Sequence, residues 1–127
     1  LLVPRMHRGV LKAISYARSV SQDCRALHVK MDDKVTSELK REWASHGVDM
    51  PLVVLDAPYR SIMRPVIEYI DQAIVDNPGD LITVIVPEAV PKHWWQRFLH
   101  NNVAIGLKVA LSSRRNVVVT SVRYLLD

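Results

Sequence analysis

LITVIV, at residues 81–86, is the most strand-like run of the chain and the one that decides its fold. Its residues are almost all apolar and do not alternate with polar ones. Continuous runs of this kind are typical of strands whose two faces are both covered, as in parallel sheets flanked by helices. The turn sequence NPGD, at residues 77–80, precedes the run. We therefore expect an α/β protein.

Further strands and helices alternate on both sides of this run. Apolar runs predict strands at residues 1–3, 24–29, 51–55 and 117–120. Apolar residues at helical spacing predict helices over residues 10–20, 33–46, 62–74 and 95–107. Asp32 or Asp33 can cap the second of these helices, and Gly47 can end it. Pro65 restricts the start of the third helix to residues 61–65, since proline fits only the first turn.

This alternation predicts one doubly wound domain spanning residues 1–127. Strands that alternate with helices form right-handed crossovers and build a parallel sheet. We expect a five-stranded parallel sheet of order 3-2-1-4-5, with the strands numbered along the chain. Neither an internal repeat nor a linker marks a second domain. Ligands of such sheets bind beyond the carboxyl ends of the strands.

Composition narrows the class of protein. The chain has 127 residues, of which 49% are hydrophobic and 24% charged, as in ordinary globular domains. Cys24 is the single cysteine, which excludes an intrachain disulfide; we expect a buried thiol in a reducing compartment.

No apolar run reaches the roughly 18 residues of a membrane span. The abrupt start at Leu1 leads us to expect a fragment of a longer protein.

The net charge is +4, and the last third of the chain carries most of the excess. Only Glu88 and Asp127 oppose the basic residues there, which are Lys92, Arg97, Lys108, Arg114, Arg115 and Arg123. A basic surface suggests an anionic partner such as phosphates, nucleic acid or an acidic membrane face. A solvated basic surface with no partner explains the charge equally well.

Three loops follow the carboxyl ends of predicted strands: residues 4–9, 56–61 and 87–95, the last running into a helix. Guanidinium groups pair with phosphates, and aromatic rings stack on bases. The loops therefore predict a nucleotide-phosphate site, whose candidate residues are Arg5, Arg8, Asp56, Tyr59, Arg60, Ser61, Lys92, Trp94, His100 and Asn101. Structural alternatives are solvated loop charges for the arginines, a loop cap for Asp56, and core packing for the neighbouring Trp95.

No catalytic, metal or cofactor signature accompanies these residues. No Ser or Cys has a matching His and Asp pattern, and the five histidines lack metal-ligand spacing. The four glycines form neither a dinucleotide-binding motif nor a P-loop. We expect a protein that is not an enzyme, holds no cofactor or metal, and does not bind nucleic acid, since no recognition motif is present.

Several segments form a recognisable set. The most specific are Pro58-Tyr59-Arg60-Ser61 and a run with Pro91-Lys92, Trp94-Trp95 and His100-Asn101. The others are Val3-Pro4-Arg5, Val86-Pro87 and Val117-Val118-Val119-Thr120. Together they resemble the cytoplasmic carboxy-terminal domain of KimA-type permeases, over essentially the whole chain. These are bacterial potassium importers of the amino acid–polyamine–organocation superfamily, which also holds amino acid permeases.

The resemblance implies a universal-stress-protein-like fold, a homodimer, and covalent attachment to a transmembrane transporter on the cytoplasmic side of the bacterial membrane. It also implies control by a small nucleotide, cyclic di-AMP. One departure is at residues 87–91, which lack the glycine-rich turn of ATP-binding stress proteins. A ligand-free dimerisation module of the permease and an ATP-binding stress protein are the alternatives. We expect dimerisation through the last strand, residues 117–122, which is an edge in the predicted order.

Overall fold

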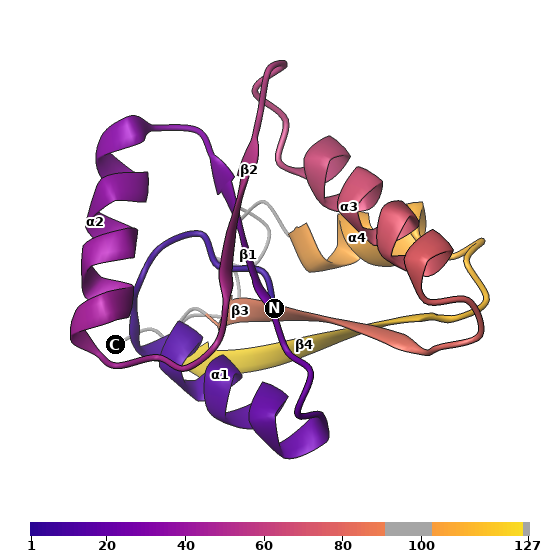
Figure 1. Ribbon diagram of the computed structural model, residues 1–127, viewed down its shortest axis with the longest axis horizontal. Coiled ribbons are helices and arrows are strands. Elements are labelled where there is room, and N and C mark those ends of the chain that lie inside the picture. The colour runs from indigo at the N-terminus through magenta and orange to yellow at the C-terminus, as the bar shows by residue number, and fades with distance from the viewer. Residues whose placement is uncertain (91–102, 126–127) are drawn as a thin grey trace.

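The structure, a computed structural model, describes residues 1–90 and 103–125 and is an α/β fold (Figure 1). Its elements follow one another as α1 (Arg8–Val20), β1 (Ala26–Lys30), α2 (Asp33–Ser45), β2 (Leu52–Asp56), α3 (Met63–Asp76), β3 (Ile82–Val90), α4 (Val103–Ala110) and β4 (Val117–Leu125). From α1 onward the helices and strands alternate as predicted, whereas residues 1–3, predicted as a strand, form none. The predicted helix over residues 95–107 is described only from Val103 onward.

Local signals in the sequence set the bounds of the helices. The Asp32 carboxylate accepts a hydrogen bond from the Lys34 N–H at 2.8 Å and so caps α2, as predicted. Gly47, with a φ of 61°, follows the end of this helix in the left-handed conformation that glycine adopts without strain. Pro65 lies in the first turn of α3, where its missing N–H has no helical partner to lose.

The strands pair in two parallel sheets, β1 with β2 and β3 with β4. Residues 1–3 lie between the two pairs. The Val3 N–H donates to the Leu27 carbonyl oxygen of β1 at 2.8 Å, and the Leu2 N–H donates to the Ile85 carbonyl oxygen of β3 at 2.9 Å. Residues 1–3 form a single bridge, Leu2 with Leu27, and no named strand. The continuous five-stranded sheet of order 3-2-1-4-5 therefore stays a prediction.

β3 and β4 are longer than predicted. Residues 87–90, expected in a loop, belong to β3 and pair with the end of β4. The Ile82 N–H donates to the Asn116 carbonyl oxygen, and in a parallel strand alternate residues bond to the same neighbour. Even-numbered residues of β3 therefore bond to β4, and Pro87 turns its nitrogen away from that ladder. A proline that breaks no ladder bond is tolerated in a strand.

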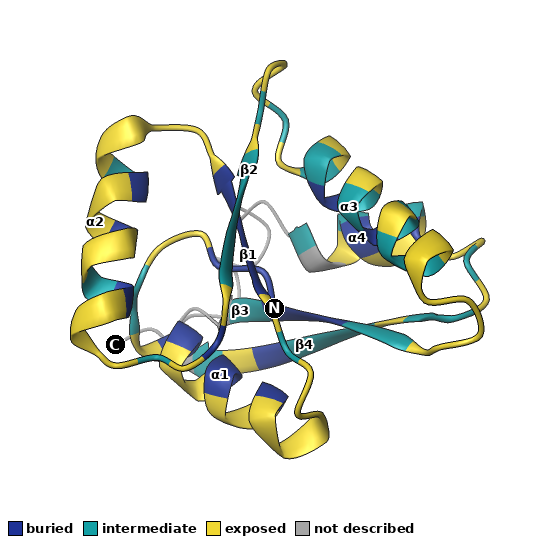
Figure 2. Ribbon diagram, viewed as in Figure 1, coloured by how far each residue is buried: buried dark blue, intermediate teal, exposed yellow. Residues whose placement is uncertain are grey.

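Hydrophobic side chains form two clusters, one on each face of the strands. Leu1, Val3 and Ile85 pack with α1 and α2, whereas Leu2 and Val84 pack with α3 and α4. Figure 2 shows the same division, with the buried side of each helix turned toward the strands and the exposed side toward solvent. Apolar residues on both faces of the strands explain the continuous apolar runs in the sequence.

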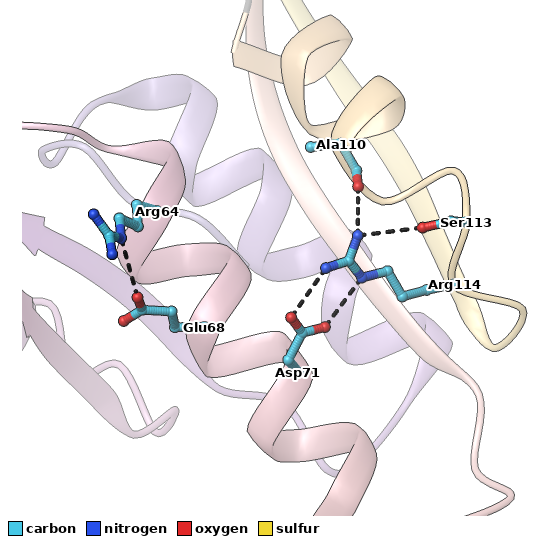
Figure 3. Close-up of polar contacts among 6 residues, drawn as sticks. All are labelled: Arg64, Glu68, Asp71, Ala110, Ser113 and Arg114. Atoms are coloured by element: carbon cyan, nitrogen blue, oxygen red, sulfur yellow. Dashed lines mark hydrogen bonds and ion pairs between the residues drawn. The ribbon is translucent and has the colours of Figure 1, made fainter.

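An ion pair joins α3 to the loop after α4. Two guanidinium nitrogens of Arg114 bind the two carboxylate oxygens of Asp71 at 3.1 and 3.0 Å, and a third bond reaches the Ala110 carbonyl oxygen at 2.6 Å (Figure 3). The hydrogen bonds from Arg114 lower the pKa of the Asp71 carboxyl and those to Asp71 raise the pKa of Arg114. Arg114 thus belongs to the basic third of the sequence but has an acidic partner in the fold.

Candidate functional site

The candidate residues that the structure describes lie between residues 1–3 and the start of α1, and between the end of β2 and the start of α3. Arg5 and Arg8 follow residues 1–3, and both side chains are exposed. Asp56 is the last residue of β2, and residues 57–62 form the turn between β2 and α3. In Figure 1 this turn rises to the top of the view, while the chain between residues 3 and 8 sweeps to the left. The two chain segments that carry Arg5, Arg8 and Arg60 thus run in different directions from the strands.

Arg60 sits at a special position in that turn. Its φ of 54° is the one positive φ among the non-glycine residues that the structure describes, and its N–H donates to the Ala57 carbonyl oxygen at 3.0 Å. The side chain is exposed. Side chains with a Cβ are disfavoured in this conformation, and such strain concentrates at functional positions. The Arg60 side chain is thus exposed to solvent, while the hydrogen bond to Ala57 fixes its backbone.

Arg64, which was not among the predicted site residues, lies against one of them, Tyr59. Its guanidinium carbon lies 5.0 Å from the centre of the Tyr59 ring, and its Nε lies 3.3 Å from Glu68 Oε1 (Figure 3). The Tyr59 side chain is 72% exposed, and its ring makes a cation–π contact with Arg64. Arg64 and Glu68 are four residues apart on a predicted helix, and this spacing could have indicated that the two side chains interact.

An apolar pocket of about 200 Å³ opens among the same strand ends. Pro4 and Ile62 both line it, and these residues precede Arg5 and follow Ser61 in the chain. Its other walls come from the loop after β1, from β3 and from α4, and include Met31, Asp32, Val86, Pro87 and Val103. The pocket thus joins the loop after residues 1–3 to the turn before α3, although the arginines themselves lie on the exposed loops.

His28 also lines this pocket and is almost fully buried, with 2% of its surface exposed. Its Nδ1 lies 2.8 Å from the Val3 carbonyl oxygen, and its Nε2 lies 2.8 Å from the Thr36 hydroxyl oxygen. A carbonyl only accepts, so Nδ1 donates to Val3, and the Thr36 hydroxyl is the hydrogen-bond partner of Nε2. His28 therefore ties residues 1–3 to α2. A histidine inside an apolar strand gave no sequence signal for this role.

Two titratable side chains, Lys30 and His7, lie close in sequence to residues that line the pocket. Lys30 pairs with Asp33 at 3.0 Å, and the hydrogen bond with that carboxylate raises the pKa of the lysine. Burial lowers the pKa of His7, and the positive charge of Arg5 lowers it further, so His7 is neutral at physiological pH. Arg5 and Arg60 are exposed, and their segments contribute Pro4 and Ile62 to the pocket lining. No ion pair of either arginine is found in the part of the chain that the structure describes.

Four of the candidate residues, Lys92, Trp94, His100 and Asn101, lie outside the described residues. Within residues 1–90 and 103–125, no three His, Cys, Asp or Glu side chains are grouped closely enough to hold a metal ion. No helix in the same ranges has both the length and the apolar character needed to cross a bilayer.

Comparisons with known proteins identify the family. Residues 1–124 match the family described as the KimA potassium transporter C-terminal domain. A curated relative, the potassium transporter KimA of Bacillus subtilis (strain 168), is 28% identical over 117 residues, which cover 91% of this chain. The chain spans 19% of that relative's length. The chain belongs to the KimA potassium transporter C-terminal domain family.

Proposed function

We propose that this chain is the regulatory domain of a bacterial potassium transporter and that it binds cyclic di-AMP. The name of the Bacillus subtilis relative supports the transporter part of this proposal. In the full-length protein the domain would be attached to a transmembrane transporter and lie on the cytoplasmic side. Its role would be to bind a nucleotide and relay that state, without catalysing a reaction.

The apolar pocket at the strand ends, with arginines in the two loops beside it, is the observation that carries the proposal. Its volume of about 200 Å³ is below the roughly 300–1,000 Å³ typical of small-molecule pockets. It therefore suits one base and leaves the phosphates outside. There the guanidinium groups of Arg5 and Arg60 are the available partners, because guanidinium binds phosphate oxygens in a fork geometry.

A symmetric ligand fits a symmetric dimer. Cyclic di-AMP has two equivalent halves, so a two-fold dimer can offer one pocket to each adenine. The outer edge of β4 is a candidate interface, because β4 pairs only with β3 among the described residues. Unpaired strand edges favour pairing with another chain. The same observation supports the second candidate function, a dimerisation module that holds no nucleotide.

Calorimetric titration of the full-length protein with cyclic di-AMP, cyclic di-GMP and ATP tests the proposal. We expect heat with cyclic di-AMP alone, saturating at one nucleotide per two protomers. Heat with ATP at one nucleotide per protomer would instead identify an ATP-binding stress protein. If no nucleotide binds at high micromolar concentration, the dimerisation module is the better description of the domain.

A further inference from the structure

The outer edge of β4 is built from the backbone groups of every second residue. The Ile82 N–H donates to the Asn116 carbonyl oxygen, so the even-numbered residues of β4 turn their N–H and C=O groups toward β3. The odd-numbered residues turn theirs away from β3. The outward groups include those of Val117, Val119, Ser121 and Arg123.

Lys12 of α1 occupies this edge at Arg123. Its Nζ donates to the Arg123 carbonyl oxygen at 2.9 Å. The bond agrees with the alternation of the backbone groups, because Arg123 is one of the outward residues. Lysine on a strand edge is a common protection against pairing with another chain. A strand that extends its pairing to Arg123 therefore has to displace a cation from the acceptor.

α1 covers the same half of β4 on one face. Val122 is 8% exposed and packs in the cluster that contains Val10 and Ala13 of α1. Val118 lies on the same face as Val122, since alternate residues of a strand share a face, but it is 47% exposed. The helix and its lysine thus leave the first half of β4 uncovered.

The uncovered segment, residues 117–121, lacks the usual protections of an edge strand. Its sequence VVVTS contains no charge and no proline, and its β-branched residues favour strands. Among the residues that the structure describes, β3 is its one strand partner. An apolar edge of this kind favours pairing with a further strand. A second copy of the chain offers a strand of matching length, and two-fold symmetry pairs the segment with itself.

We propose that Lys12 sets the register in which two copies of this chain pair. Its bond to Arg123 confines the antiparallel contact to residues 117–121, with Val119 on the two-fold axis. The outward groups of Val119 then bond to those of the partner's Val119, and the outward groups of Val117 bond to those of the partner's Ser121. The proposal rests on the dimer of the proposed function and is independent of the nucleotide.

Other registers are less favourable for reasons that the edge itself supplies. An axis at Thr120 would pair Val117 with the partner's Arg123, and an axis at Ser121 would pair Val119 with it. Both registers need the Arg123 carbonyl oxygen, which accepts from Lys12. An axis at Val118 would leave Ser121 outside the ladder and would form fewer hydrogen bonds.

Single cysteines distinguish these registers. With Val119 on the axis, its two copies form a hydrogen-bonded pair with Cα atoms about 5.5 Å apart, within the roughly 4.4–6.8 Å that a disulfide spans. The two copies of Thr120 are then diagonal neighbours about 7–8 Å apart, and those of Ser121 lie farther apart.

Oxidative crosslinking of the full-length protein tests the proposal, in a background where the other cysteines, Cys24 included, are replaced by serine. We expect a covalent dimer from Val119→Cys and much less from Thr120→Cys or Ser121→Cys. The background without an introduced cysteine should give none.

The role of the lysine is tested in the same background. Lys12→Met keeps an apolar side chain but removes the ammonium, so the Arg123 carbonyl oxygen becomes available to a partner strand. Crosslinking through Thr120→Cys should then rise about three- to tenfold, the effect of one net hydrogen bond. Lys40→Met, at an exposed position of α2, is the matched control and should leave the pattern unchanged.

Two results would overturn the proposal while leaving a dimer through β4 intact. One is crosslinking that is strongest at Thr120→Cys or Ser121→Cys while Lys12 is present, and the other is a pattern that Lys12→Met does not change. The absence of a crosslink at all these positions would overturn the β4 interface as well. Neither result bears on nucleotide binding, which the calorimetric titration measures separately.

Discussion

The ring of Tyr124, near the end of β4, lies directly against the Cα of Gly9 in the first turn of α1. A Cβ at position 9 would overlap the ring atoms. The same ring packs against His7, with centroids 5.0 Å apart. This contact holds the start of α1 on the end of β4, beside the loop that carries Arg5. Glycine is required at position 9 for close approach and not for an unusual φ.

Gly9→Ala is therefore expected to destabilise the domain by about 1–2 kcal/mol. Overpacking costs roughly 1–3 kcal/mol, and the gain in helix propensity of up to about 1 kcal/mol offsets part of it. Chemical denaturation measures the difference. In a Tyr124→Ala background the clash is absent, so the same substitution should be neutral or stabilising. Equal losses in both backgrounds would contradict the contact.

The stability of the chain that begins at Leu1 should depend on pH. The folded state lowers the pKa of the terminal amine from 8.0 to about 6, so between these values the unfolded chain binds more protons. Stability therefore rises with pH across this window, by about 2–3 kcal/mol in total, and is lowest below pH 6. Denaturation midpoints from pH 5 to 9 measure it. The N-acetylated chain is the control and should lack this dependence; an unchanged profile after acetylation would assign it to other groups.

Arg60 allows charge and backbone to be tested separately. Arg60→Ala should weaken cyclic di-AMP binding by roughly 1.5–3 kcal/mol, the range for hydrogen bonds to charged groups, and leave stability unchanged. Arg60→Gly should lose the same affinity but stabilise the turn by about 1 kcal/mol, because glycine adopts the positive φ freely. Calorimetry and denaturation report the two effects. Arg18→Ala, at an exposed position of α1, is the control. An equal loss of affinity in this variant would show that the ligand responds to overall positive charge and makes no specific contact with Arg60.

Thr36→Val should expose the role of His28 beneath the pocket. The substitution keeps the shape but removes the hydroxyl that bonds to His28 Nε2, leaving a buried ring nitrogen unpaired. A loss of about 1–3 kcal/mol in unfolding free energy is expected. Thr36→Ser retains the hydroxyl and should lose clearly less. If valine and serine variants are equally stable, the hydrogen bond is not what holds α2 to residues 1–3.

Ser121→Pro should weaken a dimer that forms through the edge of β4. Since the Ile82 N–H bonds to Asn116, odd-numbered residues of β4 direct their N–H groups away from β3. Proline at 121 removes one outward donor without breaking the ladder with β3. Light scattering over a concentration series should show more monomer. Val75→Lys, an exposed change on α3, is the control, and the same shift there would place the interface elsewhere.

The first three helices and the four named strands could be predicted from the sequence because their signals are local. Asp32 and Gly47 mark α2, and the run at 81–86 marks β3. The extent of β3 was missed because Pro87 is ordinarily a strand terminator, and only the ladder shows that its nitrogen faces away from β4. Cys24, expected to open a strand, lies two residues before β1 and donates its thiol hydrogen to the carbonyl oxygens of Ser21 and Ala17.

The site was less accessible from the sequence. The turn at residues 57–62 was placed correctly before α3, but the strained φ of Arg60 has no signature in an arginine. His28 and Ile62 were passed over because their contribution depends on contacts between distant segments. Arg64 was overlooked because its stacking on Tyr59 needs the geometry of the turn. Sequence periodicity reports which face of an element is buried, not which faces meet.

Leu2 lines both the apolar pocket and a larger cavity of about 450 Å³ beside β1 and β3. The two residues that follow it, Val3 and Pro4, belong to the wall of the apolar pocket. An extended backbone is the least compliant path through a domain, since its covalent bonds scarcely stretch. A displacement of Leu2 along the chain would therefore reach the pocket wall at Val3 and Pro4 without any relay of side chains. The two cavities are then mechanically coupled through the backbone of residues 2–4.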